Sequence, residues 1–405
     1  MLGTDDTDKI TIKNSPIYAA VTFWLLFVAT NADLNGSQII WWGSVGLFIG
    51  VFLLTYQMKI RLNNYALWIC AFAVISLSSA LWAINSSLVF NTMKSMFVQI
   101  VVLVILHSSI RSRNDIEFLL KLVLFTCVLN AAYLVCTNRE LLTQQASSAS
   151  DRLGDQEGWN ANGIGMMASI SVMLSLYFLK RATTWSGKIL YTLFIVFLAF
   201  ISLITGSRKA VVILMGGMAA YIFLSSNGKR IRSLFSIVLI LSLIWYLIVE
   251  TPYFYAIIGW RVEAFLSQFT GKGELDSSAE NRKILIVAAI DAWKERPILG
   301  HGLDCFRYFG KIATGMDYYA HNNYVEILAD LGIVGFTVYY CGYAYALVKS
   351  WKYRQNKLSL LLFVLLCVLL VIEYACVTYT DFYFEVIIML LFANARFGNK
   401  ENSYE

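Results

Sequence analysis

The chain has 405 residues, of which 58% are hydrophobic and only 14% are charged, and its formal net charge is +6. Soluble proteins have roughly 25% charged residues, so this composition excludes an ordinary soluble domain and is typical of a membrane protein. Only three prolines and 25 scattered glycines are present, which excludes a low-complexity chain.

The first residues, MLGTDDTDKITIKNSP, are acidic and polar. A cleaved signal peptide begins with a basic segment, so we expect none here. Most of the seven cysteines fall in apolar runs, which is typical of small buried hydrophobes. No pair has the spacing of a metal site, and a disulfide framework is not expected.

Twelve apolar stretches follow one another along the chain. A helix needs about 20 apolar residues to cross a bilayer, and the first and last stretches are short by that measure. The stretches are centred near Phe23, Gly46, Val74, Val98, Phe125, Ala168, Val196, Met215, Leu239, Tyr340, Phe363 and Ile388. The predicted fold is an all-α integral membrane protein with about twelve transmembrane helices in a single domain, residues 1–405.

Lysine and arginine alternate between successive connections. The even-numbered connections and both chain ends carry two to four of them, whereas the odd-numbered NADLNGSQ, INSS and TYTD carry none. Short cytoplasmic loops are enriched in Lys and Arg, so both termini are predicted to be cytoplasmic. The odd-numbered connections are then extracytoplasmic.

Three odd-numbered connections break this rule. The fifth contains Arg139 and Arg152, the seventh is the short TGSRKA with Arg208 and Lys209, and the ninth is a long loop, residues 251–320. Charges at the membrane edge are costly and usually mark a functional site. The alternative for Arg208 and Lys209 is that they snorkel to anionic lipid headgroups.

The long loop inserted between the ninth and tenth helices is predicted to be partly helical. Residues 284–293 form an apolar run with charges at both ends, Pro297 stops the run, and the sequence GHG then turns the chain. A helix on the membrane face or across the mouth of the bundle fits this pattern. The preceding GKGELDSSAENR shows no periodicity.

Unusual polar residues therefore converge on one predicted surface, outside the cell. They are Arg152, Asn162, Arg208, Lys209, Arg261, Arg282, His301 and His321. The guanidinium fork of arginine matches the oxygens of a phosphate, so this set suits a lipid-linked phosphate or diphosphate. Carboxylate pairing is the alternative for Arg261 and for Arg282.

Histidine is largely neutral at pH 7 and can take a proton from a hydroxyl group. His321 begins the tenth helix and is a candidate base for transfer from a diphosphate-linked glycan, with Arg208 and Arg282 neutralising the leaving group. The residues alone equally allow His321 a capping or interfacial role. Asn322 is left between orienting His321 and capping the helix, and His301, between two glycines, fits a turn.

Metal use has little support in the sequence. The loops contain neither DxD nor HExxH, and Asp276, Asp304 and Asp317 lack ligand spacing. Asp381 and Glu385 could share a face with Glu373, where structural pairing is favoured over contacts with sugar hydroxyls.

GHGLDCFRYF and the later AHNNYVEILADLGIVGF together resemble the signature of the O-antigen ligase and polymerase superfamily. TGSRKAVV resembles the Ser-Arg marker of that family at the outer end of a helix. DRLGDQEGWNANGIG is similar to its Arg-plus-Asn-x-Asn entry to a middle helix. The resemblance extends from about Trp68 onward.

This resemblance implies a mostly helical, metal-independent glycosyltransferase that needs no cofactor. It would take a glycan from undecaprenyl diphosphate on the outer face of the bacterial cytoplasmic membrane and invert the anomeric centre. Arg208, Arg282 and His321 match the positions of catalytic residues. The candidate substrate-binding residues are Arg261, Lys209, Asn162, Arg152, Asn322 and His301.

The motifs do not separate two activities in the family. A polymerase extends O-antigen, capsule or exopolysaccharide repeat units, whereas a ligase moves a finished chain to lipid A core. The N-terminal third looks more like that of capsule and exopolysaccharide polymerases, which favours a polymerase. Expected partners are lipid-linked donor and acceptor glycans, membrane lipids, a flippase and a chain-length regulator, and no nucleic acid.

A lipid-linked oligosaccharide flippase is the rival from another class. Transporters place charge near the bilayer midplane, on broken helices. Here the main ionisable residues within helices are Lys94 and Glu373, and the charged cluster lies at one face beside a folded loop. This distribution favours an enzyme.

Overall fold

The computed structural model describes residues 15–56, 63–139, 152–155, 159–226, 228, 230–267 and 277–398. Those residues form helices and connections, with no strand among them. The main helices of the first half are α1 (Pro16–Thr30), α2 (Ala32–Asn35), α3 (Gln38–Tyr56), α4 (Asn64–Ser78), α5 (Ser86–Ser109), α6 (Arg113–Thr137), α8 (Ala161–Arg181) and α9 (Trp185–Ile204). Those of the second half are α10 (Arg208–Leu224), α11 (Arg230–Glu250), α12 (Pro252–Phe254), α13 (Trp260–Ser267), α14 (Ser277–Glu295), α15 (Phe306–Thr314), α16 (Asn323–Lys352), α17 (Lys357–Glu373) and α18 (Phe382–Ala395).

Each of the twelve predicted centres falls within a different helix. Eight helices of the described chain are long and apolar enough to cross a membrane, and α1 and α18 are shorter apolar helices. The chain is therefore a multi-pass membrane protein. The total of twelve crossings, like the side of the membrane on which each end lies, stays a prediction.

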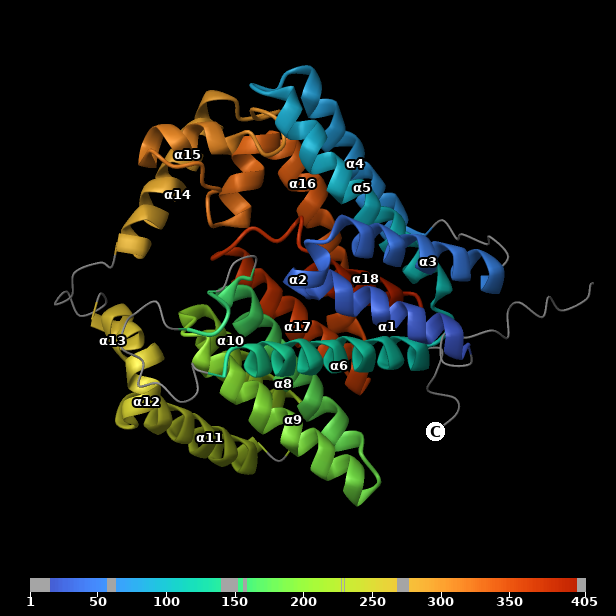
Figure 1. Ribbon diagram of the computed structural model, residues 1–405, viewed down its shortest axis with the longest axis vertical. Coiled ribbons are helices and arrows are strands. Elements are labelled where there is room, and N and C mark those ends of the chain that lie inside the picture. Colours follow the sequence, from blue (N-terminus) through green and yellow to red (C-terminus); the bar gives the residue numbers. More distant parts are fainter. Residues whose placement is uncertain are drawn as a thin grey trace, which may run out of the picture.

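The bundle is built around its most buried helices. Most residues of α8 are buried, α18 is buried along its whole length, and in α11 the buried residues are Ser233, Ile244 and Ile248. α8 packs against α6, α9 and α10, as Figure 1 shows. The exposed leucine and phenylalanine side chains of α11 suit contact with lipid tails rather than with water.

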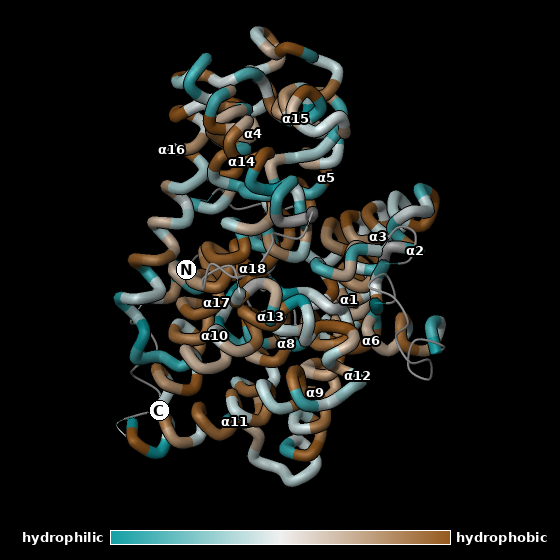
Figure 2. The backbone as a smooth tube through the Cα atoms, turned by 90° about the vertical axis from the view of Figure 1, so that its left-hand side faces the viewer, coloured by the Kyte–Doolittle hydropathy of each residue, from teal (hydrophilic) through white to brown (hydrophobic). Residues whose placement is uncertain are grey.

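The part of the long loop that contains α14 and α15 has a small core of its own. α14 packs on α15 and α16, and the buried side chains there form a separate cluster around Leu285, Ala289 and Phe306. Figure 2 shows hydrophilic stretches near α14, α15 and α5, whereas α10 and α11 are mainly hydrophobic. The predicted apolar run 284–293 lies within α14, whereas the assignment of residues 251–320 to an extracytoplasmic loop stays a prediction.

α16 is broken at Gly332, whose φ of 61° and ψ of −165° are not helical. We call residues 323–331 the short arm and residues 333–352 the long arm. Residues 297–302 of the loop cross this break, where the Ile333 N–H donates to the Pro297 carbonyl at 2.9 Å. A Cβ at Gly332 would lie 2.3 Å from the Ile298 oxygen, so the crossing requires glycine at this position.

Candidate active site

The turn between α9 and α10 joins two helix ends. The Ser207 hydroxyl accepts a hydrogen bond from the Ala210 N–H at 3.3 Å and so caps α10. The same hydroxyl donates to the side-chain oxygen of Asn162, in the first turn of α8, at 2.9 Å. Arg208 and Lys209 follow directly as the first residues of α10. The turn therefore brings three predicted site residues together.

Arg152 lies beside the same turn. The neighbouring Leu153 N–H donates to the Ile204 carbonyl at 3.2 Å, which attaches residues 152–155 to the end of α9. The Arg152 guanidinium forms an ion pair with the Asp155 carboxylate. Arg152 is thus near Arg208 in the fold, with its charge balanced by Asp155.

The backbone around His321 is fixed on both sides. His321 has a φ of 55°, in the left-handed region that few residues other than glycine adopt. Before it, the Ala320 N–H donates to the Glu326 carboxylate. After it, the Asn322 side chain accepts from two backbone N–H groups of the first turn of α16, at 3.0 and 3.3 Å. Asn322 therefore caps the helix, which is one of its two predicted roles.

The imidazole of His321 is held neutral by its surroundings. It is half-buried, and its ring centre is 4.2 Å from that of Tyr319. Burial, followed by repulsion from Arg282 and from Lys209, lowers the pKa of His321 to about 4. At pH 7 the ring is therefore unprotonated, which is the form that can accept a proton from a hydroxyl group.

Three basic residues act on one another beside this histidine. Arg208 and Arg282 both interact electrostatically with the Lys209 ammonium, and Lys209 and Arg282 act on His321. The Lys209 ammonium also donates to the Ala375 carbonyl in the connection between α17 and α18. We call Arg208, Lys209 and Arg282 the cationic cluster. Its residues come from α10 and from the loop helix α14. The cluster lies beside His321, which directly precedes the cap of α16.

Two further predicted residues have other surroundings. Arg261, on α13, holds its guanidinium over the Trp260 ring, 5.0 Å from the ring centre. His301 is 3% exposed, and its Nε2 lies 2.8 Å from the Ala292 carbonyl. The His301 carbonyl also accepts from the Ile84 N–H, so this residue joins α14 to the connection before α5. Contacts of Arg261 and His301 with substrate stay predictions.

Two buried carboxylates that order the site were not predicted. Glu326 and Asp330, each 1% exposed, lie one turn apart on the short arm. Asp330 accepts from the backbone N–H groups of Asp304 at 2.8 Å and Phe306 at 2.7 Å. The sequence signal for them was a pair of acidic residues four positions apart in an otherwise apolar helix, because buried acids need hydrogen-bond donors.

The connection between α17 and α18 is attached to α16 by further polar contacts. The Glu373 carboxylate accepts from the Tyr343 hydroxyl at 2.6 Å and the Thr378 hydroxyl at 2.7 Å. Asp381 caps α18 by accepting from the Tyr383 N–H at 3.0 Å. These contacts are made within the protein, and both the predicted pairing of Asp381 with Glu385 and Glu373 and contacts with sugar hydroxyls stay predictions.

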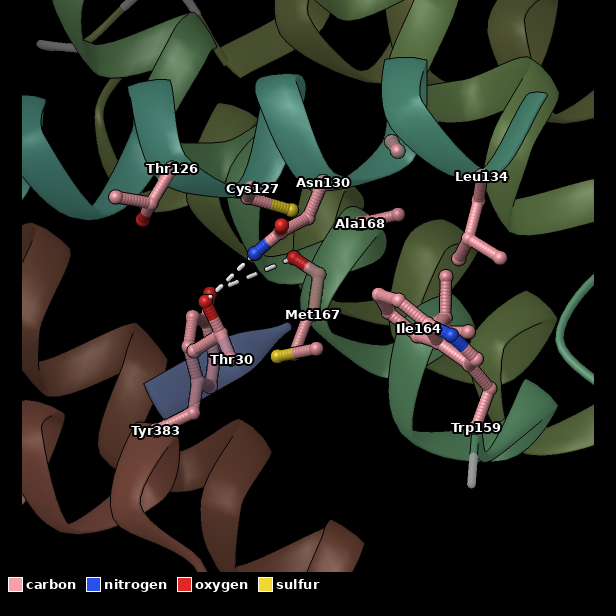
Figure 3. A pocket seen from close by; sticks show the side chains of 11 residues that line it. Thr30, Thr126, Cys127, Asn130, Leu134, Trp159, Ile164, Met167, Ala168 and Tyr383 are labelled. Atoms are coloured by element: carbon pink, nitrogen blue, oxygen red, sulfur yellow. Dashed lines mark hydrogen bonds between the residues drawn. The ribbon is translucent and has the colours of Figure 1, made fainter. Parts of the chain in front are cut away.

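The described residues enclose cavities of different character. One of about 10 Å³ lies among α1, α6 and α8, where Asn130 donates to Thr30 at 2.8 Å, and is too small for a substrate (Figure 3). An apolar groove of about 220 Å³ runs between α10 and α17. A polar cavity of about 480 Å³ lies among α5, α16 and the loops near Tyr319. Within the described ranges, no group of three His, Cys, Asp or Glu residues is arranged to hold a metal ion.

Comparison with known protein families gives a match for part of the chain. Residues 193–340 match a family model described as O-antigen ligase. The matched region runs from α9 into the long arm of α16, and it contains the whole cationic cluster and His321. No curated protein matches the sequence.

Proposed function

Because the chain belongs to the O-antigen ligase and polymerase superfamily, we propose that this membrane glycan polymerase or ligase takes its glycan from an undecaprenyl-diphosphate-linked donor. In this proposal the transfer occurs on the extracytoplasmic face of the cytoplasmic membrane, and the acceptor is a sugar hydroxyl. The proposed main activity is polymerisation of polysaccharide repeat units.

One observation carries the proposal, namely the cationic cluster beside an unprotonated His321. Two guanidinium groups and an ammonium suit the several oxygens of a diphosphate. A neutral imidazole next to them suits the removal of a proton from the incoming hydroxyl group. A flippase would need only the first feature, whereas glycosyl transfer to a hydroxyl group needs both.

The chemistry is a direct displacement. The acceptor oxygen forms a bond to the anomeric carbon while the bond from that carbon to the diphosphate oxygen breaks. The hydroxyl proton passes to the His321 imidazole, and undecaprenyl diphosphate leaves with the bonding electron pair. Arg208 and Arg282 stabilise the negative charge that develops on the leaving group. Attack opposite the leaving group inverts the anomeric centre.

Donor binding would also strengthen the base. In the free protein burial lowers the pKa of His321 most, and Arg282 and Lys209 lower it further because they repel a positive charge on the ring. A bound diphosphate brings negative charge that offsets those cations, so the pKa of His321 rises. The histidine then becomes a better proton acceptor only when a donor is present.

The apolar groove supports a lipid-linked donor. Its α10 side contains Val212, Gly216, Ala220 and Leu224, which recur every four residues and therefore lie on one face of the helix. That face begins one turn after Arg208. A polyprenyl tail in this groove would hold its diphosphate at the cationic cluster.

The test uses purified protein in nanodiscs, given lipid-linked repeat units extracted from the source bacterium and no lipid A core. Chains that lengthen are expected. If product forms only after lipid A core is added, the protein is a ligase, which is the alternative activity. If neither mixture gives product and the lipid only crosses the bilayer, the protein is a flippase.

Arg282→Lys tests the donor contact separately. Lysine keeps the charge and loses the planar fork, so the affinity for undecaprenyl diphosphate should fall roughly tenfold. Lys283→Arg, at the exposed neighbouring position, is the matched control and should bind normally. Unchanged affinity in Arg282→Lys would remove this residue from the donor site.

A further inference from the structure

The polar cavity of about 480 Å³ lies next to the cationic cluster but has the opposite chemistry. Its walls include the carboxylates of Asp304, Glu326 and Asp381, with Arg307 as the one cation among its lining residues. Arg307 is itself paired with Asp304 at 2.6 Å and with Asp317 at 3.6 Å. A cavity of this kind repels a diphosphate and accepts a neutral polar ligand.

The remaining lining residues offer both donors and acceptors. α5 contributes Asn91, with its amide, and Thr92 and Ser95, with their hydroxyls, and the connection before α18 contributes Thr380. Sugar hydroxyls both donate and accept hydrogen bonds, so mixed walls of this kind suit a saccharide. The volume lies within the range of about 300–1,000 Å³ that is usual for ligand sites.

The wall at Asp304 is held in a fixed and strained position. Asp304 has a φ of 61°, and it and His321 are the two residues other than glycine with positive φ in the described part of the chain. Its carboxylate accepts from the Thr92 hydroxyl at 2.8 Å, which joins the loop to α5. Strain of this kind, held in place by several contacts, is typical of functional sites.

Tyr319 connects the cavity to the proposed base. It lines the cavity, and its ring centre is 4.2 Å from that of His321. In a direct displacement the acceptor approaches the anomeric carbon opposite the diphosphate. The acceptor sugar therefore needs a separate binding region that adjoins His321, and this cavity adjoins it through Tyr319.

We propose that the cavity among α5, the loop at Asp304 and the connection before α18 binds the acceptor saccharide of the transfer reaction. Asn91 and Ser95 on α5 and the carboxylates of Asp304 and Asp381 are its hydrogen-bonding groups. The assignment as an acceptor site rests on the proposed glycosyltransferase function.

Cysteine labelling tests occupancy of the cavity without requiring activity. Full-length Ser95→Cys in nanodiscs is labelled with a membrane-impermeant maleimide, with wild type as the blank for the native cysteines. The probes are undecaprenyl diphosphate, the lipid-linked oligosaccharide of the source bacterium, and the free oligosaccharide released from it by mild acid. Saturating free oligosaccharide should slow labelling at least ~10-fold, since a cysteine under a bound ligand reacts only when the site is empty, and undecaprenyl diphosphate should leave it unchanged.

Ser86→Cys is the matched control, because Ser86 is exposed at the same end of α5 and points away from Asn91 and Ser95 by helical geometry. No probe should protect it. Protection of Ser95→Cys by undecaprenyl diphosphate alone would assign the cavity to the diphosphate. Protection by the lipid-linked oligosaccharide but not by the free one would show that the cavity does not bind the saccharide itself. Either result, or no protection at all, overturns the proposal.

A filling variant gives a kinetic readout. Ser95→Trp should raise the KM for the free oligosaccharide acceptor by about tenfold or more, while Ser86→Trp leaves it unchanged. The affinity of Ser95→Trp for undecaprenyl diphosphate should equal that of wild type. If the wild-type protein does not bind undecaprenyl diphosphate, the proposed function is contradicted instead. The two failures are therefore distinguishable. An unchanged KM in Ser95→Trp would overturn the acceptor assignment.

Discussion

The short and long arms of α16 meet at Gly332 and make different kinds of contact. On the short arm, the carboxylates of Glu326 and Asp330 accept backbone N–H groups of the loop. On the long arm, the backbone of Val338 accepts from the Trp68 indole at 2.9 Å, and aromatic rings pack between helices. The short arm therefore fixes the loop that forms the site, and the long arm fixes the bundle. Changes in the two arms should separate activity from stability.

The largest expected effect is on catalysis, next to the short arm. His321→Ala removes the proposed base, so the transfer rate should fall roughly 10²- to 10⁴-fold. Affinity for undecaprenyl diphosphate, measured by calorimetry in nanodiscs, should stay within about twofold, because the cationic cluster is retained. A fully active variant would show that His321 is not the base.

The break between the arms should be the most sensitive position for stability. Gly332→Ala places a Cβ against the Ile298 carbonyl and imposes a strained φ, at a cost of roughly 3 kcal/mol. Thermal unfolding in detergent measures this loss. Gly46→Ala on α3 is the control, since a Cβ there meets nothing within 4 Å. Equal melting temperatures for the two variants would contradict the close packing of residues 297–302 against Gly332.

A smaller pair of changes compares the arms directly. Asp330→Asn replaces a carboxylate oxygen that accepts from backbone N–H groups with an NH₂ group. The free energy of unfolding should fall by about 1–3 kcal/mol. Gly342→Ala on the long arm pushes a methyl group against Trp68 and should cost a similar ~1–3 kcal/mol. The two unfolding curves should shift alike.

Activity should distinguish these two variants. Transfer measured well below the melting temperature should fall in Asp330→Asn, because the loop at Asp304 loosens, and should be preserved in Gly342→Ala. Equal losses of activity would mean that both arms serve only the bundle.

The smallest effect concerns pH. The pKa of His321 is lowered, so its neutral form is complete well above pH 4 and is lost as the pH falls through about 4. The acid limb of kcat/KM should therefore lie near pH 4. Arg282→Gln removes a cation that lowers this pKa, so the limb should move to higher pH.

Lys283→Gln serves as the control, because this neighbouring cation is exposed and is not among the charges that act on His321. Its acid limb should coincide with that of wild type. An acid limb that stays in place in Arg282→Gln would separate Arg282 from the histidine.

The helices were predictable from the sequence because long apolar runs carry a strong signal. All twelve centres lie in helices, and the apolar run 284–293 lies in α14. The break in α16 was not predictable, since a glycine among apolar residues is equally compatible with a continuous membrane helix. Only the crossing of residues 297–302 makes Gly332 special, and that contact joins segments about 35 residues apart.

The site was partly predictable. Basic residues on the predicted extracytoplasmic side and the family resemblance pointed to Arg208, Lys209, Arg282 and His321. The structure brings these four together. The roles of Glu326, Asp330 and Asn322 depend on which backbone donors lie opposite them. Those donors come from tertiary folding, which the pattern of residue types does not contain.

The contacts of residues 297–302 at Gly332 also impose an order on folding during synthesis. Residues 297–302 leave the ribosome before the segment 329–334 on which they depend for their hydrogen bonds. The loop must therefore wait, already delivered to its side of the membrane, until the next helix has been made and inserted. A chain truncated before Gly332 would therefore contain the helices before α16 but lack the Ile333 and Val334 N–H groups that donate to Pro297 and Ile298.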